Sequence, residues 1–202
     1  MSEYFTYTDI IPPIPEDVLP TIEELLEAPH WSNGEKFESM RHPWAKKYYH
    51  RKKVPAKLKE WLLDNLPFKG EISAGFNIFN TLMKPHRDIR DETYNYLLDA
   101  GGEIYTEWYN KQEDNQSLTT WDSIRPDTSN DIFVQSSDII TLDSVLIEPR
   151  RWHKIKTDVV HGTRGNQTGP RIILSVITPE MVKTPDNPLL AEAVSTWFTE
   201  WK

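Results

Sequence analysis

The sequence of 202 residues contains no cysteine. This absence excludes disulfides, thiolate metal sites, iron–sulfur clusters and cysteine nucleophiles. Long apolar runs are also missing, so no segment of the sequence predicts a membrane span. The N-terminus, Met-Ser-Glu-Tyr-Phe-Thr, lacks the basic start and the apolar stretch of a signal peptide. We therefore expect a cytoplasmic protein with no membrane partner.

Glycine is scarce relative to proline, with eight Gly against 15 Pro, and there are eight Trp. This balance favours a β-rich body with many turns and extensive aromatic packing. The hydrophobic share of 38% and the charged share of 27% are typical of a soluble globular protein. The length suits one domain with a full-sized core.

Charge is unevenly distributed along the chain. Residues 41–59 hold eight basic and no acidic side chains, so the rest of the chain carries −8 − 8 = −16. Aromatic residues interleave with this basic segment, which could bind phosphates and stack on bases. It could equally be a solvated surface or match acidic loops. Because the bulk of the chain is acidic, a nucleic-acid partner is disfavoured but stays open.

Residues 1–69 are expected to form a helical and irregular preamble. Thr21 and Glu24 have the spacing of a capping box and predict a short acidic helix over residues 22–27. Proline at its start and apolar residues at helical spacing predict a second helix over residues 55–65.

From Gly70 onward, apolar and polar residues alternate as in β-strands. The strand-like runs cover residues 72–79, 94–100, 103–109, 131–135, 139–147, 153–161 and 171–178. This number of short strands predicts a mainly β fold over residues 70–180, as a closed barrel or jelly roll. Residues 111–130 are polar and are expected to be an insertion loop, and residues 181–202 to end in a short C-terminal helix.

His86 and Asp88 form a His-x-Asp pair just after a predicted strand. On an extended backbone, residues two apart point to the same side, so both side chains can reach one metal ion. A site with two histidines and one carboxylate leaves open positions and is typical of non-haem iron(II). Taken alone the pair is weak evidence, since a surface turn would show the same spacing.

His161 and Arg171 strengthen the case for a site. His161 is expected to close the strand before Gly162, and Arg171 opens the apolar strand that follows ten residues later, 171 − 161. An arginine on the inner face of a small barrel needs an anion, and its planar fork matches a carboxylate. Alternatively, Arg171 would extend to the surface and pair with an acidic residue of the chain.

These residues together resemble the Fe(II)/2-oxoglutarate-dependent oxygenases. That family is built on a double-stranded β-helix, a jelly-roll or cupin-like barrel, and carries His-x-Asp/Glu, a distal His and then Arg or Lys. Here the pattern is His86, Asp88, His161 and Arg171, with a gap of 161 − 86 = 75 residues that the polar insertion lengthens. The resemblance covers roughly residues 70–180.

The resemblance implies that His86, Asp88 and His161 hold Fe(II), and that 2-oxoglutarate and O2 are cosubstrates. It also implies that Arg171 binds the far carboxylate of 2-oxoglutarate. The expected reaction is hydroxylation of a small molecule, an amino acid or a protein or peptide side chain, coupled to decarboxylation of 2-oxoglutarate to succinate.

Further cosubstrate contacts follow from the same resemblance. Tyr94 or Tyr96 is expected to assist, because a Tyr on the strand after the motif commonly does so. Several family members have Ser two positions after the Arg, whereas this chain has Ile173 there, and Ser175 lies one pair further along the same face. Weaker candidates are Asn77, Asn80 and Thr163.

The remaining candidates have other interpretations. His153 is expected at the rim of the barrel rather than among the ligands. Arg90 and Arg164 are expected to reach an acidic substrate from the barrel mouth. Two other functions remain open, namely a cupin-like metal enzyme that does not use 2-oxoglutarate, and a catalytically silent β-barrel used as a binding module.

Overall fold

The computed structural model describes residues 2–27, 49–52, 54–68, 70–83, 85, 86, 88, 90–111, 119, 120, 132, 133, 139–182 and 198. Its strands are β1 (Phe5–Tyr7), β2 (Tyr49–Lys52), β3 (Ser73–Phe79), β4 (Glu92–Asp99), β5 (Gly102–Lys111), β6 (Thr119–Thr120), β7 (Ile132–Phe133), β8 (Ile139–Leu146), β9 (Trp152–Lys156), β10 (His161–Gln167) and β11 (Arg171–Ile177). Its helices are α1 (Ile22–Glu27), α4 (Ala56–Asn65) and the 3₁₀ turn η3 (Pro179–Met181).

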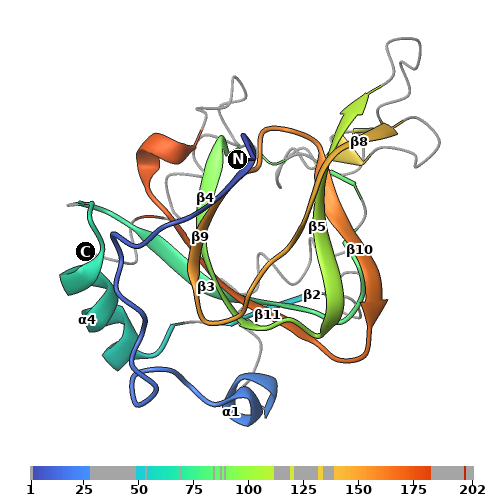
Figure 1. Ribbon diagram of the computed structural model, residues 1–202. Helices are drawn as coiled ribbons and strands as arrows, with labels where there is room; N and C mark the ends of the chain where they lie inside the picture. Colours follow the sequence, from blue (N-terminus) through green and yellow to red (C-terminus); the bar gives the residue numbers. More distant parts are fainter. Residues whose placement is uncertain are drawn as a thin grey trace.

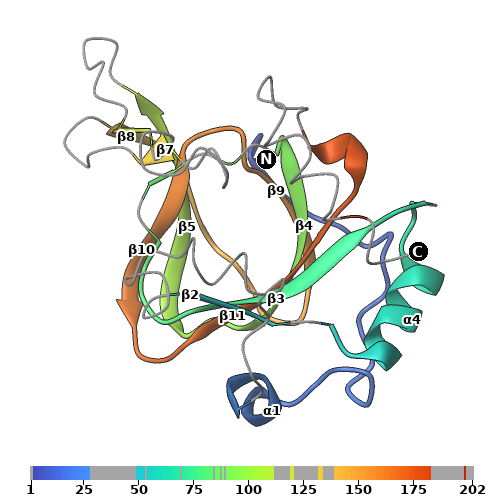
Figure 2. The ribbon, with the colours of Figure 1, turned by 180° about the vertical axis from the view of Figure 1, so that it is seen from behind.

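Two antiparallel sheets form the body of the protein (Figure 1). The larger sheet has the strand order β1-β9-β4-β11-β3-β2, and the smaller sheet has the order β10-β5-β8. The sheets face each other across the interior, and the view from behind shows the same arrangement (Figure 2). The structure thus confirms the predicted mainly β, jelly-roll-like fold.

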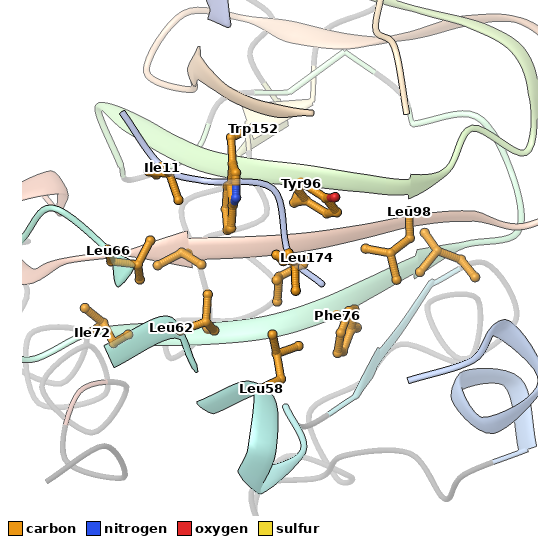
Figure 3. Close-up of a cluster of buried hydrophobic side chains, with 14 of the residues drawn as sticks. Ile11, Leu58, Leu62, Leu66, Ile72, Phe76, Tyr96, Leu98, Trp152 and Leu174 are labelled. Carbon is orange, nitrogen blue, oxygen red and sulfur yellow. The ribbon is translucent and has the colours of Figure 1, made fainter. Parts of the chain in front are cut away.

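The outer face of the six-stranded sheet carries the main hydrophobic core (Figure 3). Phe76 on β3 and Leu174 on β11 are fully buried on this face. Helix α4 covers them with Leu58 and Leu62, which are also fully buried, and the N-terminal lead-in adds Ile11. Burying one such leucine contributes roughly 1.5–3 kcal/mol. The core therefore lies between the sheet and α4, and the opposite face of the sheet is not part of it.

The inner face of the same sheet is unusually polar. Successive residues of a strand point to opposite faces, so Arg171 and Ser175 on β11 point away from the core that contains Leu174. Asn95 on β4 and His153 on β9 share this inner face, because they pair directly with each other and Asn95 bonds to Ser175. Polar groups are thus placed between the sheets.

The two helices of the preamble are confirmed. At the start of α1, the Glu24 amide donates to the Thr21 hydroxyl at 3.1 Å, and the Thr21 amide donates to the Glu24 carboxylate at 2.8 Å. This is the reciprocal capping box that the sequence predicts. Helix α4 begins directly after Pro55, whose fixed φ suits a helix start.

The preamble also contains strands that the sequence analysis missed. Strand β1 pairs with β9 and strand β2 pairs with β3, so residues 1–69 supply both edges of the larger sheet. Each is short, and its partner is distant in sequence, so neither has a local pattern that reveals it. Residues 41–48 and 53 of the basic segment at 41–59 lie outside the described residues, and Lys57 in the described part pairs with Asp17.

The predicted single strand over residues 153–161 is wrong. The chain instead forms β9, which ends at Lys156, and β10, which begins at His161. Thr157 ends β9 because its hydroxyl donates to the Arg90 carbonyl and its amide donates to the Asp91 carbonyl. His161 therefore opens a strand instead of closing one.

Other predictions fall largely outside the described residues. Of the predicted insertion at 111–130, the structure describes Lys111 in β5 and the strand β6. Within the predicted strand at 131–135, the structure describes β7. Within the predicted C-terminal helix it describes one residue, Phe198, which is helical, buried and packed with Ile177 and Met181. No helix in the described part of the chain has the length and apolar character that a membrane span requires.

Candidate metal centre

The segment that carries His86 runs beside the first residues of β10. The amides of His86 and His161 each donate to the other residue's carbonyl at 2.8 Å, so the two residues form an antiparallel bridge. Three residues earlier, Met83 accepts from the Thr163 amide and donates its own amide to the Thr163 hydroxyl. These bonds place the two imidazoles next to each other, with ring centroids 4.5 Å apart.

The turn between β9 and β10 positions Asp88. The Asp88 amide donates to the Thr157 carbonyl at 2.9 Å. Thr157 is the same residue that holds the carbonyls of Arg90 and Asp91, so one buried threonine fixes the backbone on the C-terminal side of the ligand segment. The break between β9 and β10 is therefore part of the site's construction.

His86, Asp88 and His161 form a group that can hold a metal ion. One ligand atom from each residue lies within 4.8 Å of the other two, and the His86 Nε2 is 3.6 Å from the Asp88 Oδ1. Both histidines are buried, at 6% and 5% exposure. Three donors gathered on one side, two of them imidazoles, suit a divalent transition metal with open positions for exogenous ligands.

The protonation states of the group also suit a metal. Burial alone would raise the pKa of the Asp88 carboxyl, but the charge of Arg90 and then those of the two histidines outweigh it and lower the pKa to about 2. Burial, together with neighbouring His86, lowers the pKa of His161 to about 4. At neutral pH Asp88 is thus a carboxylate and His161 a neutral imidazole, the forms that bind metals.

The ring of His161 is held in one tautomer. Its Nδ1 lies 2.9 Å from the Val159 carbonyl, which can only accept a hydrogen bond, so Nδ1 carries the proton. The lone pair is then on Nε2, the atom left for the metal. On the other side, Arg90 forms an ion pair with the second oxygen of Asp88. Val159 and Arg90 thus orient two of the three ligands.

Arg171 projects from the start of β11 toward the smaller sheet. It is buried at 3% exposure, and its Nη1 and Nη2 donate to the Ile104 carbonyl at 3.3 Å and the Thr106 hydroxyl at 3.1 Å. Its Nε is buried without a hydrogen-bond partner in the described structure, and no described carboxylate forms an ion pair with the guanidinium. Burial lowers the pKa of Arg171 to about 10, so it remains a cation at neutral pH. A buried cation with a free donor fits an anionic ligand.

Arg171 and the metal group lie at neighbouring levels of the interior. Thr106, which bonds to Arg171, pairs with Thr163, and the next residue along the same face of β5, Trp108, pairs with His161. Two residues of strand span roughly 7 Å. The arrangement therefore places the guanidinium of Arg171 and the metal group next to each other along the inner face of the smaller sheet.

The expectation that Tyr94 or Tyr96 assists Arg171 is wrong. Tyr96 pairs with Leu174, and both belong to the hydrophobic core under α4. Tyr94 packs against the same core, with its ring 5.3 Å from Phe68. Both tyrosines therefore lie on the face of the sheet opposite to Arg171, where they cannot contact a ligand bound to it.

Ser175 shares the inner face with Arg171, as expected, and is part of a hydrogen-bonded row. The Asn77 Nδ2 donates to the Ser175 hydroxyl at 2.7 Å, and this hydroxyl donates to the Asn95 Oδ1 at 2.7 Å. The row crosses three neighbouring strands, β3, β11 and β4. Of the weaker candidates, Thr163 bonds to the ligand segment through Met83, whereas Asn80 is exposed after the end of β3.

Three further predictions need correction. His153 is not at the rim but buried between the sheets, at 1% exposure. Arg90 pairs with Asp88 and so supports a ligand, instead of standing free at the barrel mouth. Arg164 lies on the outer face of the smaller sheet, where its Nε is 3.9 Å from buried Glu107.

The sequence analysis missed Thr106 and Asn95, which contact the predicted site residues Arg171 and Ser175. A signal for Asn95 was present, because it is a polar residue that alternates with two tyrosines in the middle of a strand. Thr106 had no comparable signal. Its role depends on the distance between two sheets, which local patterns do not report.

No protein-family model and no curated protein matches the chain. Three solved structures are similar to it at low levels. They are Peruvianin-I, a cysteine peptidase from Thevetia peruviana latex (13% identity, TM-score 0.34, 85% of this chain and 86% of that chain), the polyketide cyclase RemF from Streptomyces resistomycificus (12%, 0.30, 75% and 84%) and the protein SO0799 from Shewanella oneidensis (14%, 0.30, 85% and 95%). These likenesses are too slight to indicate a function.

Proposed function

We propose that the protein is a non-haem Fe(II)/2-oxoglutarate-dependent oxygenase that hydroxylates a small molecule, an amino acid or a protein side chain. His86, Asp88 and His161 would hold the iron, and Arg171 would bind the far carboxylate of 2-oxoglutarate. The bound iron and cosubstrate supply the oxidising chemistry, in which 2-oxoglutarate, O2 and R–H give succinate, CO2 and R–OH. The chain's own residues bind and orient these groups.

The observation that carries this proposal is the pairing of a metal-binding group with a buried, partly unsatisfied cation. The three ligands alone would suit many metal enzymes. Arg171, however, is a cation at 3% exposure whose Nε has no partner in the described structure. Such a donor costs free energy unless a ligand satisfies it. A cosubstrate with one metal-binding end and one distant carboxylate satisfies both features at once.

The residues around the ligands have definable tasks. Val159 keeps the proton of His161 on Nδ1, so that Nε2 is available to the metal. Arg90 holds one oxygen of Asp88 and thereby orients the carboxylate. Thr106 and the Ile104 carbonyl hold the Arg171 guanidinium in place before any ligand binds. The site is thus pre-organised for a ligand that bridges the metal group and Arg171.

Anaerobic addition of Fe(II) and then 2-oxoglutarate tests the proposal. We expect a weak visible charge-transfer band that requires both additions and disappears in His161→Ala. In Arg171→Ala, the 2-oxoglutarate concentration needed for the band should rise by orders of magnitude while iron affinity hardly changes. Iron binding without the band would favour a metal enzyme that does not use 2-oxoglutarate. No iron binding at all would favour a catalytically silent barrel.

A further inference from the structure

His153 is a buried titratable group that has no role in the metal group or in the contacts of Arg171 described above. It lies on β9 directly opposite Asn95 on β4, and Asn95 accepts a hydrogen bond from Ser175 on β11. Ser175 in turn shares a strand face with Arg171. One continuous inner surface across three strands therefore carries His153, Asn95 and Arg171. All three residues are at most 4% exposed.

We infer that His153 acts together with Arg171 on the far carboxylate of the dicarboxylate ligand, and that it takes up a proton when this carboxylate binds. The inference rests on the proposed function, because it assigns a further contact within the same site. It identifies a binding residue and a proton-linked step that the metal group and Arg171 do not by themselves require.

The orientation of the His153 ring supports this role. Its Nδ1 lies 3.2 Å from the Arg151 carbonyl, which accepts a hydrogen bond and so keeps a proton on Nδ1. The rings of Phe5 and Tyr7 contact the imidazole from β1, with centroids 5.6 Å and 6.4 Å away. In the neutral ring Nε2 carries a lone pair and cannot donate to a carboxylate, whereas protonation turns it into a donor.

Burial, with a smaller contribution from the charge of Arg171, keeps His153 neutral in the free protein. Burial lowers its pKa to about 4; the bond to the Arg151 carbonyl opposes this drop, and the positive charge of Arg171 adds to it. Of the titratable groups that face the ring, β1 supplies the Tyr7 phenol, whose oxygen accepts a hydrogen bond from the Glu148 amide, and β11 supplies Arg171. No described carboxylate contributes to the pKa of His153.

A carboxylate bound to Arg171 reverses this balance. Its negative charge offsets that of the guanidinium, and an anion close to the imidazole favours the protonated form. Asn95 offers the carboxylate a further hydrogen-bond donor. The Ser175 hydroxyl already satisfies the Asn95 Oδ1, which leaves the Asn95 amide nitrogen as a donor. Binding of a carboxylate should therefore be tighter at lower pH, down to the range where the metal ligands protonate.

The test measures binding of 2-oxoglutarate to the Mn(II)-loaded protein by calorimetry, in two buffers of different ionisation enthalpy. Near pH 6 we expect net uptake approaching one proton per ligand, and affinity should fall by up to tenfold per pH unit as pH rises. The control ligand is 2-oxopentanoate, which has a methyl group in place of the far carboxylate and should cause no uptake. Equal uptake with both ligands, or none with 2-oxoglutarate, would overturn the inference.

Two substitutions separate binding from a merely structural role. In His153→Gln the amide can donate without titrating, so binding should persist with its pH dependence and proton uptake lost. In His153→Leu no donor remains, and affinity should fall at least tenfold at pH 6. The wild-type measurement stands even if both variants misfold.

The same measurements distinguish the two claims. If 2-oxoglutarate binds and gives the charge-transfer band without proton uptake, the role of His153 is wrong and the oxygenase proposal stands. If 2-oxoglutarate does not bind at all, both claims fail.

Discussion

The Arg171 side chain extends from β11 to β5, where its Nη2 donates a hydrogen bond to the Thr106 hydroxyl at 3.1 Å. This single side chain spans the interior between the two sheets. Its contact, Thr106, pairs with Thr163, which lies two residues beyond His161 on the same face of β10. The contact holds the guanidinium, the candidate anion-binding group, at a fixed position relative to the metal group.

Thr106→Val should weaken 2-oxoglutarate binding by about five- to twentyfold, because the guanidinium loses the hydrogen bond to the Thr106 hydroxyl that holds it in place. Valine has nearly the shape of threonine, so the backbone of β5 should not change. Titration of the charge-transfer band gives the affinity, and Thr141→Val, the same change at an exposed position of β8, is the matched control. The account of Arg171 is contradicted if Thr106→Val binds 2-oxoglutarate as tightly as the wild type.

Gly101→Ala should destabilise the protein by about 2 kcal/mol or more, since Gly101 has a φ of 68° and an added Cβ would lie 2.7 Å from the Arg171 backbone nitrogen. The clash falls on backbone and cannot be relieved by a side-chain rotation. Gly169→Ala, in the loop that Gly101 contacts, is the control, because a Cβ added there would have no atom within 4 Å. Thermal unfolding should show a large loss for the first variant and little for the second.

Ser175→Ala should cost about 1–3 kcal/mol of unfolding free energy, because it leaves the Asn77 amide and the Asn95 carbonyl oxygen without their shared partner. Denaturant unfolding measures the loss. Thr141→Ala, at an exposed position of β8, is the control and should change stability by no more than about 0.5 kcal/mol. Similar small losses in both variants would show that the polar row contributes little.

The stability of the metal-free protein should fall as pH decreases from 6.5 toward 4. His153 and His161 have pKa values of about 4 in the folded protein against 6.5 ordinarily, so in this range the unfolded chain binds protons that the folded protein does not. Each histidine should contribute a slope of about 1.4 kcal/mol per pH unit.

Denaturant unfolding at several pH values measures this slope, and His153→Gln should reduce it by about half. Asp88 adds a separate loss at lower pH, because its pKa of about 2 lies below the ordinary 3.8 and its contribution disappears as pH falls between these values. A pH-independent stability between 6.5 and 4 would mean that the two histidines are not buried in the neutral form.

The sequence predicted the ligand group better than its surroundings. His86, Asp88 and His161 could be selected because their residue types and order are chemically specific. The local structure of His161 was predicted wrongly, because the break after Lys156 depends on bonds from Thr157 to Arg90 and Asp91, more than 60 residues away. Such long-range bonds leave no local pattern.

The faces of β4 show a second limit. Alternation alone indicates that Tyr94 and Tyr96 share one face and Asn95 the other. It does not indicate which face points inward, because both tyrosines and the asparagine are plausible ligand contacts. Helix α4 decides this, since its leucines bury the face that carries Tyr96 and leave Asn95 to the interior.

The central claim is that His86, Asp88 and His161 hold Fe(II) and that a dicarboxylate bridges it to Arg171. The most direct measurement is anomalous diffraction from crystals grown anaerobically with Fe(II) and 2-oxoglutarate. The account predicts one iron peak between the Nε2 atoms of His86 and His161 and the Asp88 carboxylate, with density for 2-oxoglutarate ending on Arg171. Iron at another position, or 2-oxoglutarate bound away from Arg171, would contradict it.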